Sequence, residues 1–172
     1  MTKSQINPMP KFFDRYIIQV SENDLLLALN NSLKSIQNID IQKLESIGDK
    51  VYELNKWTVK DILQHIIDTE RIMAYRALRF ARNDKTILPG YDENLFANNV
   101  NTSKRTISDL IEELSIVRQS TILLVKNIDT ENILYLGTCF EQQISALALG
   151  FVIVGHQHHH LNVIKEKYEV LI

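Results

Sequence analysis

Four long segments of the sequence repeat apolar residues every three to four positions, and no proline interrupts any of them. The segments run from Ser21 to Ile36, from Thr58 to Ala81, from Ser103 to Ile128 and from Gln142 to Tyr168. This spacing matches the 3.6-residue period of an α-helix with one apolar face, and no strand-like alternation of period two competes with it. The pattern predicts an all-α fold with four main helices, plus a short helical turn around residues 12–18.

Two of these helices carry signals for where they begin. Ser21 is followed three residues later by Asp24, and Thr58 is followed three residues later by Asp61. A hydroxyl residue followed by an acid at this spacing satisfies the free backbone N–H groups at the start of a helix. We therefore expect helix starts at Ser21 and Thr58.

The link between the second and third helices, residues 83–102, is much longer than the usual connection in a compact domain. The second helix would be about 25 residues, or some 37 Å, long, and an extended link of about twenty residues spans more than that. The link can therefore return along the whole bundle and make helices two and three parallel. We expect a four-helix bundle with up-down-down-up order and one long crossover between helices 2 and 3.

Composition narrows the class of protein further. The chain has 172 residues, 19 basic and 21 acidic side chains without clustering, and one cysteine, Cys139. This length suits a single domain, residues 1–172, and the scattered charges favour no nucleic-acid partner. The lone cysteine rules out a disulfide framework and suits the reducing cytoplasm. The apolar stretch 144–154 is too short to cross a bilayer, so no membrane partner is expected.

Four of the five histidines lie between positions 156 and 160, and the fifth is His65. On a helix, His156, His159 and His160 fall within an arc of about 100°, while His158 points away. If helices two and four are antiparallel, His65 lies at the same height as this group, and imidazole is a common metal ligand. The spacing favours a three-histidine metal site over a packed core histidine beside a surface run. It leaves the pairs His156/His160 and His156/His159 both open.

Several short motifs resemble those of the DinB/YfiT-like superfamily of bacterial metal-dependent hydrolases and thiol transferases. They are KWTVKDILQH at 56–65, DTER at 68–71, RALR at 76–79, LPGYD at 88–92, FFDRYI at 12–17, and GHQHHH at 155–160 followed by IKEKY at 164–168. The resemblance spans nearly the whole chain. It implies a four-helix bundle with the crossover described above and one divalent metal ion, nickel or zinc first and manganese or iron(II) next. The ligands it implies are His65, His156 and His160, with water in the remaining positions.

The resemblance also implies an activity on a small-molecule substrate, either hydrolysis or transfer of a low-molecular-weight thiol. A non-catalytic bundle that binds a small ligand is the alternative. Members of the family often form homodimers, so a homodimer is expected. One position departs from the family pattern, because an acid commonly follows the first histidine of the closing motif and this chain has Gln157. The departure puts the activity in question more than the metal site.

Other polar and aromatic residues near the expected site are weaker candidates. Asp68, one turn beyond His65, is a candidate base or a group that orients a ligand imidazole, although a solvated helix position is the more ordinary explanation. The candidate substrate-binding residues are Trp57, Tyr91, Arg118 and His159. Trp57 is alternatively a residue that packs the start of the second helix, and Arg118 one that pairs with a buried acid.

Overall fold

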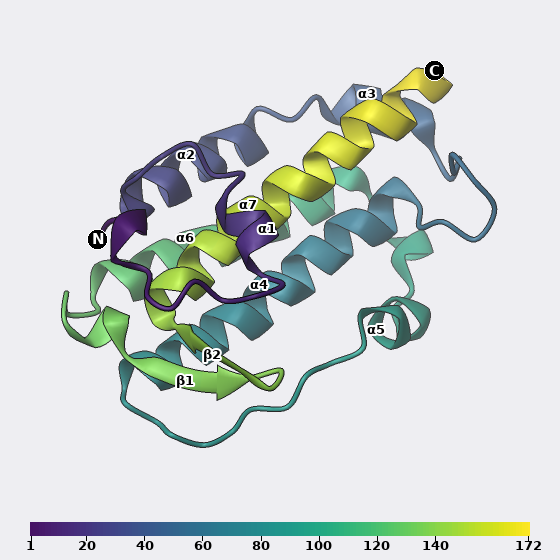
Figure 1. Cartoon of the computed structure of the whole chain (residues 1–172). Coiled ribbons are helices and arrows are strands. Elements are labelled where there is room, and N and C mark those ends of the chain that lie inside the picture. The colour runs from purple at the N-terminus through teal and green to yellow at the C-terminus, as the bar shows by residue number, and fades with distance from the viewer.

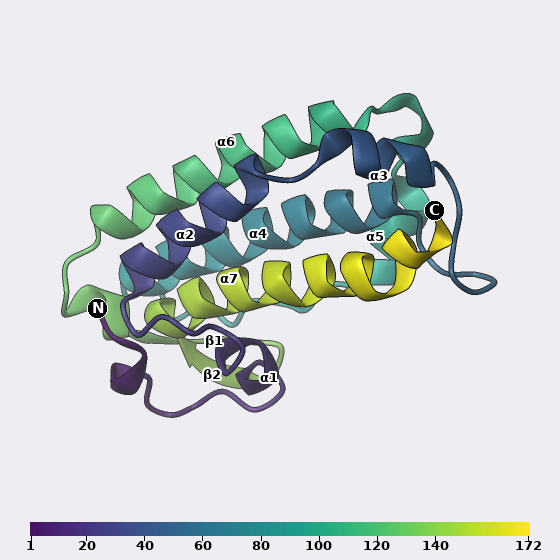
Figure 2. The same ribbon diagram turned by 90° about the horizontal axis from the view of Figure 1, so that it is seen from above.

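The computed structural model describes all residues, 1–172, and shows a mostly helical protein built on four long helices (Figures 1 and 2). The long helices are α2 (Leu25–Gln37), α4 (Val59–Ala81), α6 (Ile107–Lys126) and α7 (Ala146–Val163). Three short helices accompany them: α1 (Asp14–Ile17), α3 (Ile41–Ile47) and α5 (Glu93–Asn99). The bundle and the short helical turn near the N-terminus were expected. Neither α3 nor α5 was predicted from the sequence.

The all-α expectation is wrong in one place, because two strands precede α7. Strands β1 (Leu136–Cys139) and β2 (Gln142–Ser145) form an antiparallel hairpin in which Cys139 lies opposite Gln142. Its two-residue turn places Phe140 and Glu141 at φ values of 50° and 59°. This left-handed turn is typical of hairpins but is normally occupied by asparagine and glycine. The last helix consequently begins at Ala146, and not at Gln142.

The start of α4 agrees with the prediction from the sequence, and the starts of α2 and α6 lie later than predicted. Thr58 and Asp61 form the expected capping box at the start of α4. In α2, however, Asp24 is itself the capping residue and accepts a hydrogen bond from the Leu27 N–H, so the helix begins at Leu25 and not at Ser21. The start of α6 also lies later than Ser103, because Thr106 caps it.

The connection between α4 and α6 runs back along the outside of the bundle, past α5, as Figure 1 shows. Two backbone contacts fix its first half: the Leu88 N–H donates to the Thr138 carbonyl of β1, and the Pro89 carbonyl accepts from Arg76 of α4. The crossover therefore passes over one face of α4. None of the helices is both long enough and apolar enough to span a bilayer.

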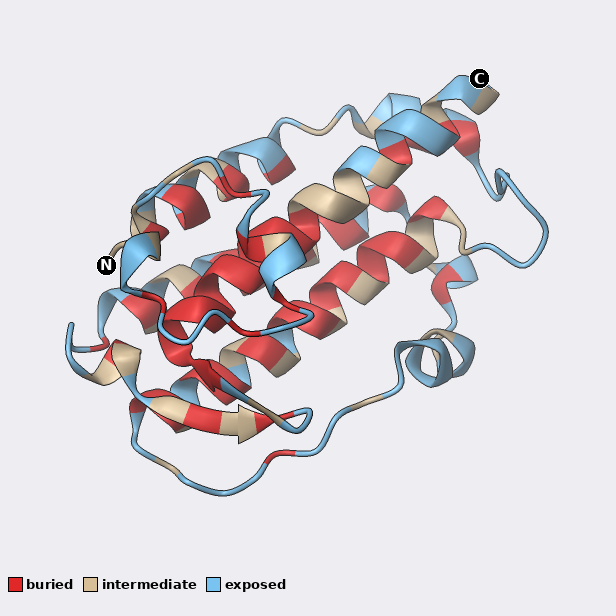
Figure 3. Ribbon diagram, viewed as in Figure 1, coloured by how far each residue is buried: buried red, intermediate tan, exposed pale blue.

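Helix α7 is the central element, and its first twelve residues, Ala146–Gln157, are all buried (Figure 3). A helix that is apolar on all sides must be covered on all sides; α4, α2 and α1 pack around it. Gly155 permits the closest of these approaches. A Cβ atom there would lie 1.9 Å from the Tyr16 carbonyl oxygen, so any larger residue would push α1 off α7. The absent side chain thereby places Tyr16 beside His156.

Candidate metal centre

Three histidines from two helices meet between α4 and α7. The Nε2 atom of His156 lies 3.0 Å from Nε2 of His65 and 3.1 Å from Nε2 of His160. The nearest ligand atoms of all three residues lie within 4.8 Å of one another. His65 lies in the second turn of α4, and the other two lie in the second half of α7. His159 is not part of this group.

The donor set fits a divalent metal ion. Two nitrogens that are each about 2.1 Å from one ion lie about 3.0 to 4.2 Å apart, depending on the angle between the bonds. The two measured separations fall at the short end of that range. Three imidazoles are a common set for zinc and related ions and leave further coordination positions for water or substrate.

Burial keeps these three imidazoles neutral. Removal from water lowers the pKa of His65 to about 4 and that of His160 to about 3, and it holds the pKa of His156 well below its ordinary value. For His156 and His160, the neighbouring histidines lower the pKa further, because a positive charge on one disfavours a charge on the next. Metal ions bind the neutral form of imidazole, so the site is in the ligand state at neutral pH.

The lowered pKa values predict that the metal-free protein loses stability in mild acid. In the unfolded chain these histidines titrate near 6.5, so below that pH the unfolded state binds more protons than the folded state. The free energy of unfolding should fall from pH 6.5 down to about pH 4, by up to about 1.4 kcal/mol per pH unit for each histidine. Urea unfolding at several pH values measures this slope. His65→Gln should make the slope shallower; an unchanged slope would contradict the assignment.

A pocket of about 590 Å³, counting its open mouth, adjoins the histidines. Its floor is the face of α4 that carries His65, Thr69, Met73 and Arg76, and α7 contributes His156 and Val152 beside it. The walls come from α1 and the segment before it, from the crossover and from the hairpin turn: Phe12, Phe13, Arg15, Tyr16, Gly90, Tyr91, Glu93 and Phe140. Aromatic rings and a few polar groups thus surround a space beside two of the three histidines.

Three of the four candidate substrate-binding residues lie at cavities beside the cluster. Tyr91 lines the pocket described above, and its hydroxyl lies 2.7 Å from the Thr69 Oγ1. Trp57 and His159 line a second cavity, which His160 also lines. The Trp57 ring packs against His65 with a centroid separation of 4.8 Å. Each of the two cavities thus contains at least one histidine of the cluster.

Asp68 lies near the cluster in a smaller cavity that His65 and Tyr91 also line. Its Oδ1 accepts a hydrogen bond of 2.9 Å from the Gln64 amide. Burial raises the pKa of this carboxyl above its ordinary value, and the hydrogen bond from Gln64 opposes that rise. Asp68 is therefore half-buried beside the site and is not a fully solvated helix residue.

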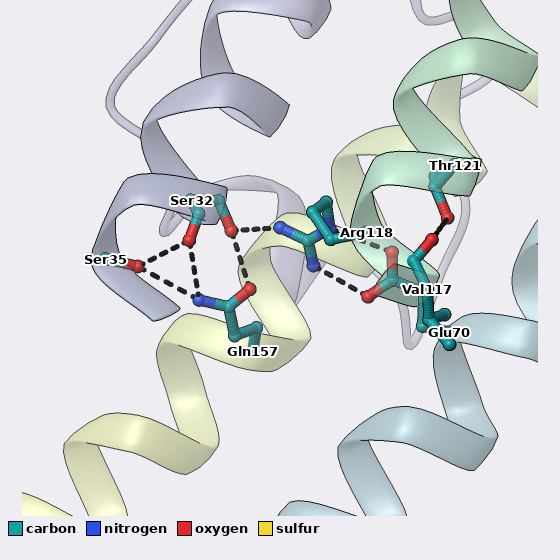
Figure 4. Close-up of polar contacts among 7 residues, drawn as sticks. All are labelled: Ser32, Ser35, Glu70, Val117, Arg118, Thr121 and Gln157. Atoms are coloured by element: carbon teal, nitrogen blue, oxygen red, sulfur yellow. Dashed lines mark hydrogen bonds and ion pairs between the residues drawn. The ribbon is translucent and has the colours of Figure 1, made fainter. Parts of the chain in front are cut away.

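Arg118 lines none of the cavities beside the histidines; it is buried and binds protein groups of α2 and α4 (Figure 4). Its Nε and Nη2 donate to the two carboxylate oxygens of Glu70, at 2.8 and 2.9 Å, and its Nη1 donates to Ser32. The alternative interpretation, a buried acid as its partner, describes what the structure shows. Glu70 forms this pair because its side chain faces the interior between α4 and α6.

Gln157 belongs to the same buried network. Its Oε1 accepts a 2.6 Å hydrogen bond from Ser32, and its Nε2 donates to Ser35 (Figure 4). The side chain thus points toward α2 while its neighbour His156 points toward α4. An acid at position 157 would face Ser32 and Arg118, so the glutamine here removes no proton carrier from the pocket.

Sequence reasoning missed most of the pocket wall. Arg76, Tyr16 and Phe12 lie in motifs that resemble the family, but their spacing gave no role, since only the fold brings them to His65. Phe140 gave no signal at all. Both Phe12 and Phe140 have positive φ values, 69° and 50°, and their rings pack 5.6 Å apart at the pocket. Strained backbone of this kind often occurs where a side chain must serve a site.

Comparison with known proteins agrees with this architecture. No curated protein is similar enough to the chain to count as a match. A solved structure with 18% sequence identity matches with a TM-score of 0.66, over 92% of this chain and 87% of its own. It is YfiT from Bacillus subtilis, described as a probable metal-dependent hydrolase with an unusual four-helix bundle topology. The family model of the DinB superfamily matches residues 30–164. The chain therefore belongs to the DinB superfamily.

Proposed function

We propose that the protein is a metal-dependent hydrolase that acts on a small molecule at the histidine cluster. The observation that carries the proposal is the convergence of His65, His156 and His160 beside a pocket that His65 and His156 line. The description of YfiT as a probable metal-dependent hydrolase supports it. In this proposal residues 1–172 form one domain, and the long helices follow the up-down-down-up order.

The three histidines would hold the divalent cation, with nickel and zinc as first candidates. Neutral ligands leave such a cation its full charge, so it supplies Lewis-acid activation to a nucleophile and to the group attacked. Asp68 is the proposed proton carrier, because its raised pKa lies closer to neutrality than that of an exposed aspartate. Phe12, Tyr91 and Phe140 would exclude water from the apolar part of the substrate.

The proposal is tested by assaying the zinc-loaded and nickel-loaded protein for hydrolysis of 4-nitrophenyl acetate. Hydrolysis should require the metal and fall by more than a hundredfold in His160→Ala. The matched control is His158→Ala, since His158 lies in the same run but outside the cluster, and it should keep the rate within about twofold. Loss of a proton carrier slows a reaction by about a hundredfold or more, so Asp68→Asn should lower kcat by that factor.

Conjugation of cysteine to monobromobimane, measured in parallel, separates the alternatives. Metal-dependent conjugation without metal-dependent hydrolysis would replace the proposal with thiol transfer. If neither reaction responds to the metal or to His160→Ala, the proposed function is wrong. Thermal stabilisation by a ligand, retained in His160→Ala, would then favour the alternative of a bundle that binds a small ligand.

A further inference from the structure

Arg76 is a buried cation without a buried anion. Only 4% of the residue is exposed, yet none of the ion pairs of the protein includes it. Its Nη2 donates a 2.8 Å hydrogen bond to the Pro89 carbonyl, and its Nη1 lies 3.7 Å from the Met73 sulfur, a weak acceptor. A guanidinium group has five N–H donors, so most of its hydrogen-bonding capacity is open to a further partner.

The other buried arginine shows what such a group normally requires. Arg118 is fully buried, and its guanidinium binds both oxygens of Glu70 and the Ser32 hydroxyl (Figure 4). A charge removed from water is costly unless an opposite charge and hydrogen bonds compensate it. Arg118 finds that compensation within the protein. Arg76 has a carbonyl, a sulfur and the Tyr91 ring, whose centroid lies 5.8 Å from its Cζ, but no anion, and it lines the pocket.

The position of Arg76 connects it to the histidine cluster. His65, Thr69, Met73 and Arg76 are spaced by four, four and three residues, which puts them on one face of α4, and all four line the pocket. Eleven residues of helix correspond to about 16 Å of rise. Because helix side chains lean toward the N-terminus, the guanidinium lies nearer to His65 than the Arg76 backbone does. The only acid at the pocket, Glu93, is exposed and makes no ion pair with Arg76.

We propose that Arg76 binds the anionic group of the substrate, a carboxylate or a similar oxyanion. The apolar body of that substrate would lie against Met73, Phe12 and Phe140, with its other end at His65 and His156. The substrate class is thus a small organic acid with an aromatic or alkyl body that reacts at the end remote from its charge. The assignment of the reactive end rests on the proposed function, whereas the assignment of the anion site does not. Arg15 also lines the pocket but is exposed, so Arg76 is the buried cation there.

Binding of 3-phenylpropionate and of its neutral analogue 3-phenylpropanamide, measured by calorimetry, tests this inference. Two full-length proteins are compared, the zinc-loaded wild type and His160→Ala. In His160→Ala the metal site is weakened, so a bound metal ion does not attract the carboxylate there. In both proteins the acid should bind about ten- to a hundredfold more tightly than the amide, the usual effect of a charge-assisted hydrogen bond in a buried site. If zinc does not bind the wild type, the proposed function is wrong, but the comparison of acid and amide still tests the anion site.

Adding Arg76→Met to His160→Ala should reduce the preference for the acid to within about twofold, and Arg76→Lys should keep part of it. Arg82→Met is the matched control, because Arg82 ends the same helix on the exposed surface. It should leave the preference unchanged. Equal binding of acid and amide in His160→Ala, binding of neither, or a preference that survives Arg76→Met would overturn the inference.

Discussion

Replacing His160 with alanine is expected to lower the affinity for zinc by more than a hundredfold. Loss of a group that merely orients a metal ligand already costs about ten- to a hundredfold, and His160 is proposed to be a ligand itself. Its Nε2 atom lies 3.1 Å from that of His156, so its removal leaves two convergent nitrogens instead of three. Competition with a chromophoric chelator measures the affinity, and mass spectrometry of the intact protein measures the metal content.

Two neighbouring histidines provide the controls for this experiment. His159→Ala tests the other pair that helical spacing allowed, and His158→Ala tests the side chain that points away. Both variants should bind zinc within about threefold of the wild type, because neither ring belongs to the cluster. Equal loss of affinity in His159→Ala and His160→Ala would mean that the metal is held in a different way from the one proposed.

The elements that hold the cluster could be predicted because their signals are local and repeated. Helix α4 has a capping box, Thr58 with Asp61, followed by more than twenty residues of helical periodicity. Helix α7 has a continuous apolar run that ends in the histidines. Once these two helices are antiparallel, the height of His65 and His160 follows from the rise per residue. The choice of His160 over His159 came from the family resemblance. On a helix, His160 lies about 40° to one side of His156 and His159 about 60° to the other, and spacing alone does not decide between such similar offsets.

The elements that build the pocket wall could not be predicted because their causes are tertiary. The hairpin turns at Phe140 and Glu141, which have none of the usual turn preferences, so no local signal announced it. Helix α1 reaches His156 only because Gly155 lacks a side chain at the crossing point. The partner of Arg118 is 48 residues away, on another helix, and no pattern within α6 identifies it.

Breaking the buried pair of Arg118 and Glu70 is expected to have the largest effect on stability. The Arg118→Met variant leaves the Glu70 carboxylate, 1% exposed, without its cation and removes a donor from Ser32. Removing one partner of a buried ion pair costs about 3–5 kcal/mol of unfolding free energy. Urea unfolding of the variant should therefore show a loss of that size.

Three further measurements distinguish burial of the charge from loss of a contact. Arg71→Met breaks a pair with Glu113 in which half of the arginine side chain is exposed, and such pairs contribute about 1 kcal/mol or less.

The double variant Glu70→Leu with Arg118→Met removes both charges and should recover much of the stability that Arg118→Met loses. Below the unfolding transition, Arg118→Met should still bind zinc within a few-fold of the wild type, because no residue of the network belongs to the histidine cluster. A double variant no more stable than the single one would show that shape and hydrogen bonding, and not the unpaired charge, dominate here. A large loss of zinc affinity would instead mean that the two faces of α7 are coupled, with Gln157 and His156 moving together.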